Sequence, residues 1–410
     1  MTASNHADAE GELISRADLA SPSDTAATGG RHFGGSQLKA PLPPGVEREL
    51  LSLTSEDGAV HSALAYRATQ APRTGVILMH PVADFTQHYA LAPLAERGYL
   101  ALGVRSRFSD DSNAVVEQAV LDLASGVRYL REQGCERVVL LGNSGGGGLA
   151  CFYQAEAEDP SVASTPAGDP PDLRQADLPP ADALVLLNAH LGRAQVLTSY
   201  LDPSVVDEKD LVETDPELDM FDPRNGPPYS EEFVRRYKAA QVARNERITA
   251  WARRRLAELA ELGYDDESFV IHRTTAALEF LDPSVDPSDR PLGWYGGPNV
   301  QWFNRAAIGL GRFATLRSWL SQFGLSSTNA LAEPNLARAQ VPVLVVQGTA
   351  DQGVFRSAAI ALYEAAGTTD KQLHWSDGGL HFFAGQPGHQ EAVLDVIDTW
   401  INERGLGSSR

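Results

Sequence analysis

Residues 137–149, Arg-Val-Val-Leu-Leu-Gly-Asn-Ser-Gly-Gly-Gly-Gly-Leu, decide the fold. An apolar strand over 137–141 is followed at once by the pattern Gly-x-Ser-x-Gly, and the residues from Leu149 are typical of a helix. A strand that turns directly into a helix forces the central residue into a strained backbone conformation. Gly142 and Gly146 are expected because larger side chains would clash where the chain packs against itself. Ser144 should therefore project from a sharp turn.

The flanking sequence alternates between apolar strands and amphipathic helices. A hairpin is predicted over 47–67, with its turn at Glu56-Asp57-Gly58. Further strands are predicted at 75–79, 99–104, 183–187, 341–347 and 371–375, with helices at 87–97, 114–133, 149–157, 357–366 and 390–402. This alternation predicts an α/β fold with a mostly parallel central sheet that carries helices on both faces.

The alternation stops between residues 191 and 338, an interval too long for a loop. We expect a large, mainly helical cap or lid insertion there, dominated by a helix over 230–262. Ser230 suits the helix N-cap and Gly263 the stop. The core domain should then comprise residues 46–190 and 339–410. Residues 1–45 are rich in Ala, Ser, Asp, Gly and Pro and are predicted to form a flexible N-terminal arm.

Composition narrows the class of protein. The formal net charge is −20, which argues against nucleic acid as a partner. No apolar run approaches the roughly 20 residues that a membrane span requires, and the polar, acidic N-terminus is unlike a signal peptide, so we expect a cytoplasmic protein. The two cysteines, Cys135 and Cys151, form no disulfide framework and are too few for a typical structural zinc site.

A serine hydroxyl needs a base to accept its proton and an acid to orient that base. Asp351 follows the late strand 341–347, and His381 lies on a loop after the last strand. Both positions fall at the carboxyl end of the sheet, where ligands bind in open α/β folds. His374, inside a strand pattern, and Asp377, in an Asp-Gly-Gly turn, are weaker alternatives. Ser144, Asp351 and His381 are therefore the predicted catalytic residues.

An oxyanion formed by this serine would need hydrogen-bond donors. Gly145 N–H lies at a helix N-terminus, which favours negative charge. The loop after strand 75–79 should supply the second donor. Pro81 has no N–H, so Val82 is the first candidate and Ala83 the next.

Several side chains near these motifs are predicted to line the substrate pocket: His80, Asn143, His88, Trp251 and Trp302. His80 has the alternative role of supporting its loop, and the tryptophans that of packing inside the insertion. His80, Asp84 and His88 are spaced four apart, which raises the alternative of a metal site, but their loop context disfavours it. We expect no metal and no organic cofactor.

The chain resembles the α/β-hydrolase superfamily across residues 47–190 and 339–404. The match lies in the order and spacing of three motifs: the turn 142–146, called the nucleophile elbow, the acid in 348–351 and the base in 379–381. Many relatives have His-Gly where this chain has His80-Pro81. The resemblance implies hydrolysis of an ester, which the predicted triad would carry out through an acyl-enzyme. The aromatic side chains of the insertion favour a moderately hydrophobic small-molecule ester. The same triad could instead act on amides, lactones or C–C bonds, or transfer the acyl group. A non-catalytic binding protein is a further alternative, and the oligomeric state is not indicated.

Overall fold

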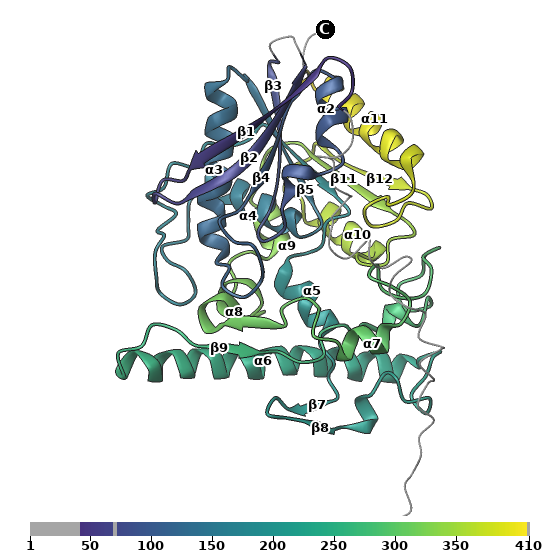
Figure 1. The fold of residues 1–410 in the computed structure, drawn as a ribbon. Coiled ribbons are helices and arrows are strands. Elements are labelled where there is room, and N and C mark those ends of the chain that lie inside the picture. The colour runs from purple at the N-terminus through teal and green to yellow at the C-terminus, as the bar shows by residue number, and fades with distance from the viewer. Residues whose placement is uncertain (1–41, 69–71, 408–410) are drawn as a thin grey trace, which may run out of the picture.

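A computed structural model describes residues 42–68 and 72–407, so nearly all of the predicted arm lies outside the described residues. Within that part of the chain, eight strands form one sheet in the order β1-β2-β4-β3-β5-β6-β11-β12 (Figure 1). The strands are β1 (Val46–Thr54), β2 (Val60–Ala68), β3 (Thr74–His80), β4 (Leu100–Arg105), β5 (Arg137–Asn143), β6 (Ala183–Leu187), β11 (Val343–Gly348) and β12 (Lys371–Ser376).

The sheet is parallel except around β2. That strand pairs antiparallel with both β1 and β4, and the pairs from β4 to β12 are all parallel. The predicted hairpin and the predicted, mostly parallel sheet are confirmed. Parallel strands all end at one edge, so the loops after β3, β5, β6, β11 and β12 gather there.

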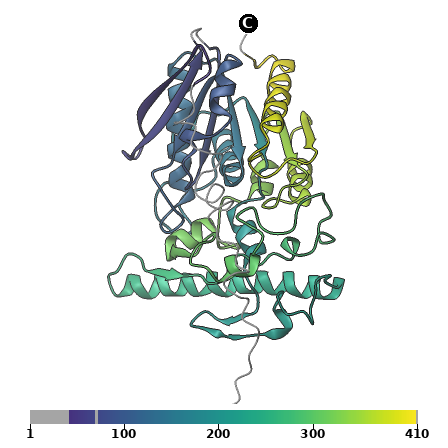
Figure 2. The same cartoon turned by 45° about the vertical axis from the view of Figure 1, so that its right-hand side comes forward.

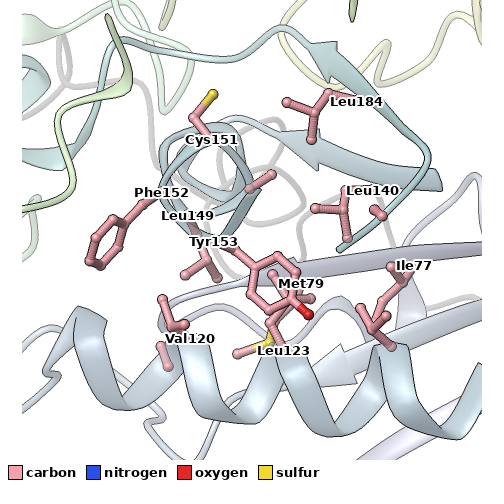
Figure 3. Close-up of a cluster of buried hydrophobic side chains, with 14 of the residues drawn as sticks. Ile77, Met79, Val120, Leu123, Leu140, Leu149, Cys151, Phe152, Tyr153 and Leu184 are labelled. Carbon is pink, nitrogen blue, oxygen red and sulfur yellow. The ribbon is translucent and has the colours of Figure 1, made fainter. Parts of the chain in front are cut away.

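The two faces of the sheet are buried by different helices, because successive strand residues point to opposite sides. Ile77 and Met79 belong to the core cluster that also holds residues of α3 (Val116–Glu132) and α4 (Gly145–Glu158), as Figure 3 shows. Val76 and Leu78 belong to the cluster on the other face, with α2 (Leu91–Glu96) and α11 (Pro387–Glu403). α10 (Arg356–Ala365) contributes Ala359 and Leu362 to the first cluster.

Most elements between β6 and β11 form a group at one end of the sheet (Figures 1 and 2). They are α5 (Arg193–Tyr200), β7 (Val205–Asp207), β8 (Asp210–Thr214), η3 (Pro216–Leu218), α6 (Glu231–Glu261), β9 (Ser268–Val270), η4 (Leu278–Phe280), α7 (Val300–Arg305), β10 (Phe313–Thr315) and α8 (Leu316–Gln322). The last helix before β11, α9 (Ala332–Leu336), instead packs against α4 and α10 and adds Ala332 and Leu336 to the first core cluster. The long helix is confirmed, and Ser230 caps it by accepting the N–H of Phe233. Two small two-stranded sheets accompany the helices.

Two helices differ from the sequence prediction. The helix expected over 87–97 is instead η2 (Phe85–Gln87) followed by α2. Pro93 stands in the first turn of α2, where its missing N–H does no harm; a longer helix would place it in the interior. The helix expected from Leu149 begins four residues earlier, at Gly145. No helix in residues 42–68 and 72–407 is both long and apolar enough to cross a bilayer.

Candidate active site

The turn between β5 and α4 has the expected strained geometry. Ser144 has φ 52° and ψ −122°, and α4 begins at the next residue. A Cβ on Gly142 would lie 2.6 Å from the Cα of Gly147, and one on Gly146 would lie 2.4 Å from the carbonyl oxygen of Met79. Real Cβ atoms do not approach backbone so closely, so both glycines are sterically required, as predicted.

His381 lies within hydrogen-bond distance of Ser144, although 237 residues separate them in the chain. Its Nε2 is 3.0 Å from Ser144 Oγ, and its Nδ1 is 2.8 Å from Asp351 Oδ2. In the neutral imidazole that fits this arrangement, Nδ1–H donates to the carboxylate and Nε2 accepts the serine hydroxyl. The structure therefore brings Ser144, His381 and Asp351 together in one hydrogen-bonded chain. His374, the alternative base, lies within β12 beside Val346.

Asp351 is buried and its orientation is fixed by the backbone that follows it. Its Oδ1 accepts the N–H groups of Gly353 (2.7 Å) and Val354 (2.8 Å). Its Oδ2 is left to His381 and to the side-chain amide of Gln347, at 3.3 Å. Each carboxylate oxygen thus has a defined set of donors, and only one of them faces the imidazole. From the segment before β11, the Tyr200 hydroxyl donates to the carbonyl of Gly353 and steadies this turn.

Asn188, which the sequence analysis missed, ties the acid loop to the base loop. It adopts φ 44° directly after β6, its Nδ2 donates to the carbonyl of His381 (2.6 Å), and its Oδ1 accepts the N–H of Gly348 (2.7 Å). The two loops touch directly as well, because a Cβ on Gly348 would lie 2.3 Å from the carbonyl oxygen of Gly379. The available sequence signal was an asparagine directly after a predicted strand, because Asn adopts the left-handed region more often than most residues.

Val82 does not present its N–H to the elbow. That N–H donates to His80 Nδ1 at 3.1 Å, and the N–H of Ala83 donates to the same nitrogen at 2.9 Å. Both candidates for the second oxyanion donor are therefore engaged by the imidazole that precedes them, and the predicted role of Val82 is wrong in this conformation. The predicted support of the loop by His80 is confirmed.

Asn143 and His88 also lie away from the expected pocket. Both are buried, and His88 Nε2 is 3.1 Å from Asn143 Oδ1, whose amide donates to the carbonyl of Leu187. Their side chains hydrogen-bond to each other and to the backbone next to the Ser144 turn, so neither is positioned to bind a substrate. Burial lowers the pKa of His88 to about 4, which keeps the ring neutral at ordinary pH.

The three residues spaced four apart do not converge on a metal position. His80 binds its own loop, Asp84 accepts the N–H of Thr86 at 2.9 Å, and His88 pairs with Asn143. No group of three His, Cys, Asp or Glu side chains arranged to hold a metal occurs among residues 42–68 and 72–407.

The aromatic side chains beside the triad are not the predicted ones. Trp251 packs edge-on against Phe269 inside the segment between β6 and β11, and Trp302 is 41% exposed on α7. Tyr295 instead stacks on the His381 ring, with centroids 5.1 Å apart, and Phe382 packs against the same ring at 4.2 Å. The Gly-rich aromatic run 293–297 was the sequence signal for such a loop over the site.

Two further histidines lie above the first residue of α4. A Cβ on Gly145 would be 2.3 Å from His80 Nε2 and 3.2 Å from His190 Nε2. Burial lowers the pKa of His190 to about 3, and the charges of Arg193 and protonated His381 act in the same direction. Burial likewise holds the pKa of His80 well below its ordinary value. His190 lies shortly after β6, and no motif in the sequence marks it as a residue of the site.

Comparison with known proteins adds to this geometry. A family model described as serine aminopeptidase, S33, matches residues 316–387, which include Asp351 and His381 but not the elbow. A search of curated proteins gives no match. Among solved structures, an α/β hydrolase, GrgF, from Penicillium sp. sh18 is 10% identical over 87% of this chain and 98% of its own, with a TM-score of 0.50. The sheet order and this likeness show the α/β-hydrolase fold.

Two other solved structures are similar at comparably low identity. A hypothetical protein from Pseudomonas aeruginosa is 14% identical over 88% of this chain and 95% of its own, with a TM-score of 0.51. The esterase domain of a Rhodothermus marinus protein is 14% identical over 87% and 98%, with a TM-score of 0.45. At identities this low a likeness shows the fold alone, so the reaction is argued from the site.

Proposed function

We propose that this protein is a serine hydrolase that cleaves a carboxylic ester through an acyl-enzyme. The observation that carries the proposal is the 3.0 Å separation of His381 Nε2 and Ser144 Oγ, at a strained turn on the carboxyl edge of the sheet. Such a pair is the arrangement that activates a hydroxyl nucleophile.

In the first half of the reaction, His381 takes the hydroxyl proton as Ser144 Oγ attacks the carbonyl carbon. The Gly145 N–H, the first of α4 and without a partner inside the helix, donates to the oxyanion. The imidazolium then gives its proton to the leaving alcohol, and the acyl group remains on Ser144. Asp351 holds the Nδ1–H tautomer and stabilises the imidazolium throughout.

In the second half, water replaces the alcohol. His381 removes a proton from the water, which attacks the acyl carbon, and returns that proton to Ser144 Oγ as the carboxylic acid leaves. The Tyr295 and Phe382 rings, which pack against His381 and against each other, support a moderately hydrophobic substrate.

An amide or peptide substrate is the second candidate. The matched model of residues 316–387 carries the description serine aminopeptidase, and the same triad serves amide hydrolysis. A panel of p-nitrophenyl esters, lactones, and amino-acid p-nitroanilides separates the two. We expect release of p-nitrophenol from short to medium acyl esters to exceed release of p-nitroaniline.

Covalent labelling by a fluorophosphonate separates an enzyme from a non-catalytic binding protein. Wild type should be labelled, and Ser144→Ala should not. Ser376→Ala is the matched control because Ser376 ends β12 before the base loop and is not part of the hydrogen-bonded chain of Ser144, His381 and Asp351, and it should be labelled like wild type. A folded wild-type protein that takes no label and hydrolyses no member of the panel contradicts the proposal.

A further inference from the structure

The ring of Tyr295 lies against the base of the triad. Its centroid is 5.1 Å from that of His381, with 29° between the two planes, so the imidazole stacks on an aromatic face. Phe382 meets the same imidazole edge-on, at 4.2 Å and 68°, and its ring is nearly perpendicular to that of Tyr295. The base itself is only 4% exposed. The group that takes the serine proton is therefore packed against an aromatic face and shielded from water.

The acid loop leaves room for this ring. Gly353, whose N–H donates to Asp351, has a φ outside the left-handed region, so its backbone conformation does not require glycine. A Cβ at this position would lie 2.7 Å from Tyr295 Cδ1 and 3.5 Å from His381 Cγ. Any other residue would push Tyr295 away from the base. The glycine thus lets one ring pack against the acid loop and the base together.

Tyr295 lies in a tight turn that packs against the rest of its segment. The N–H of Trp294 donates to the carbonyl of Gly297 at 3.1 Å, and the N–H of Gly297 donates to the carbonyl of Trp294 at 2.8 Å. The Trp294 ring is buried, with its centroid 4.4 Å from that of Tyr295 and 5.1 Å from that of Phe303. The contact with His381 is therefore supported by the packing of the segment between β6 and β11.

We propose that Tyr295 is a positioning residue, which holds the His381 ring towards Ser144 and stabilises the imidazolium that forms during the reaction. The inference rests on the proposed function. His381 becomes positively charged when it takes the proton of Ser144 Oγ, and it returns to neutral when that proton passes to the leaving alcohol. A cation over an aromatic face, within about 6 Å of the ring centroid, is stabilised by the ring, and more strongly where water is excluded. Asp351 contacts the edge of the imidazole at Nδ1 and Tyr295 contacts its face, so both can act at once.

The test compares Tyr295→Phe, which keeps the aromatic face, with Tyr295→Leu, which keeps an apolar side chain and removes the face. The stabilisation of a cation by an aromatic ring corresponds to about three- to thirtyfold in rate. On p-nitrophenyl acetate we expect Tyr295→Leu to lose about tenfold in kcat with little change in KM, and Tyr295→Phe to recover most of that loss. Tyr264 is 64% exposed in the same segment, so Tyr264→Leu is the matched control and should keep the kcat of wild type.

The pH dependence of kcat/KM gives a readout that a loss of packing alone would not move. Activity rises with pH as the base loses its proton. Without the aromatic face the imidazolium is less favourable, so the acid limb of Tyr295→Leu should lie about half a pH unit or more below that of wild type. The carboxylate of Asp351 and the guanidinium of Arg193, which acts on the neighbouring His190, are common to both proteins. Tyr295→Phe should keep the acid limb of wild type.

The outcomes separate this inference from the function on which it rests. Circular dichroism and thermal melting establish that each variant is folded, and Tyr295→Met makes the same comparison if Tyr295→Leu does not fold. Wild type that hydrolyses the ester, with the aliphatic variant within about twofold of its kcat or with an unmoved acid limb, overturns the inference alone. Equal losses in Tyr295→Phe and the aliphatic variant also overturn it, because the aromatic face is then not what matters. Wild type without hydrolase activity or fluorophosphonate labelling overturns the proposed function, and the inference falls with it.

Discussion

Changing Asp351 to Asn should abolish most turnover while leaving the fold intact, because the surrounding backbone dictates how the new amide sits. Gly353 N–H and Val354 N–H both donate to Oδ1, so the amide oxygen must take that position. The amide NH₂ then faces His381 Nδ1, where Asp351 Oδ2 now accepts at 2.8 Å. Two donors cannot share that contact, so the ring proton moves from Nδ1 to Nε2. An Nε2–H group cannot accept the proton of Ser144.

The expected loss follows from the wrong tautomer. In Ser-His-Asp enzymes this defect costs on the order of 10⁴ in kcat, which corresponds to about 5.5 kcal/mol of transition-state stabilisation. The opposite amide orientation would restore the tautomer, but it would point the NH₂ group at the N–H groups of Gly353 and Val354. Those buried donors would then lose their acceptor, so this orientation is unfavourable.

The assay is the steady-state hydrolysis of a p-nitrophenyl ester by wild type, Asp351→Asn and Asp377→Asn. Asp377 is exposed in the turn after β12 and serves as the matched acid-to-amide control, with activity near that of wild type. Thermal melting checks that Asp351→Asn is folded. A folded Asp351→Asn within about tenfold of wild-type kcat would refute the reasoning, as would an equal loss in Asp377→Asn.

Two further outcomes are expected. His381→Ala should lose nearly all ester hydrolysis and His374→Ala should keep it, because only His381 reaches Ser144 Oγ; equal losses in kcat would remove the assignment of the base. His88 should make the fold sensitive to acid. Its pKa is about 4 in the native state and about 6.5 in the unfolded chain, so the unfolded chain binds the proton first. The free energy of unfolding should therefore fall as the pH drops from 6.5 towards 4. Urea unfolding should show that this group lowers the free energy of unfolding by about 2 kcal/mol between pH 8 and pH 5. His88→Gln keeps a donor for Asn143 Oδ1 but does not titrate, so it should reduce the pH dependence of stability by that amount. An unchanged pH dependence in this variant would mean that His88 is protonated alike in the folded and unfolded states.

The sequence was sufficient for those parts of the site that follow from local pattern. Ser144 directly follows β5, and Asp351 and His381 lie in the loops after β11 and β12, so their meeting at one sheet edge could be predicted from parallel pairing alone. The long helix α6 could be placed because Ser230 and Gly263 mark its ends.

Other parts depended on contacts between distant segments. Asn188 bridges to Gly348 and His381, which lie 160 and 193 residues further along the chain. The start of α4 was missed because four glycines are poor helix formers, yet packing against neighbours such as Ala189, 2.4 Å from a Cβ on Gly147, leaves room for nothing larger. The role of Val82 turned on the orientation of the His80 ring, which no local pattern specifies.

The same reasoning explains the aromatic residues. Trp251 and Trp302 were selected for size, whereas proximity to His381 belongs to Tyr295, whose loop is positioned by the fold of the whole segment between β6 and β11. The sequence shows which side chains have the right chemistry for a site. It does not show which of several similar residues reaches that site in the folded chain.

The account depends most directly on the covalent step at Ser144. Wild-type protein mixed with p-nitrophenyl acetate and quenched in acid should carry one acetyl group, and peptide mass spectrometry should place it on Ser144, with no adduct in Ser144→Ala. An acetyl group on another residue, or ester hydrolysis that continues undiminished in Ser144→Ala, would contradict the account.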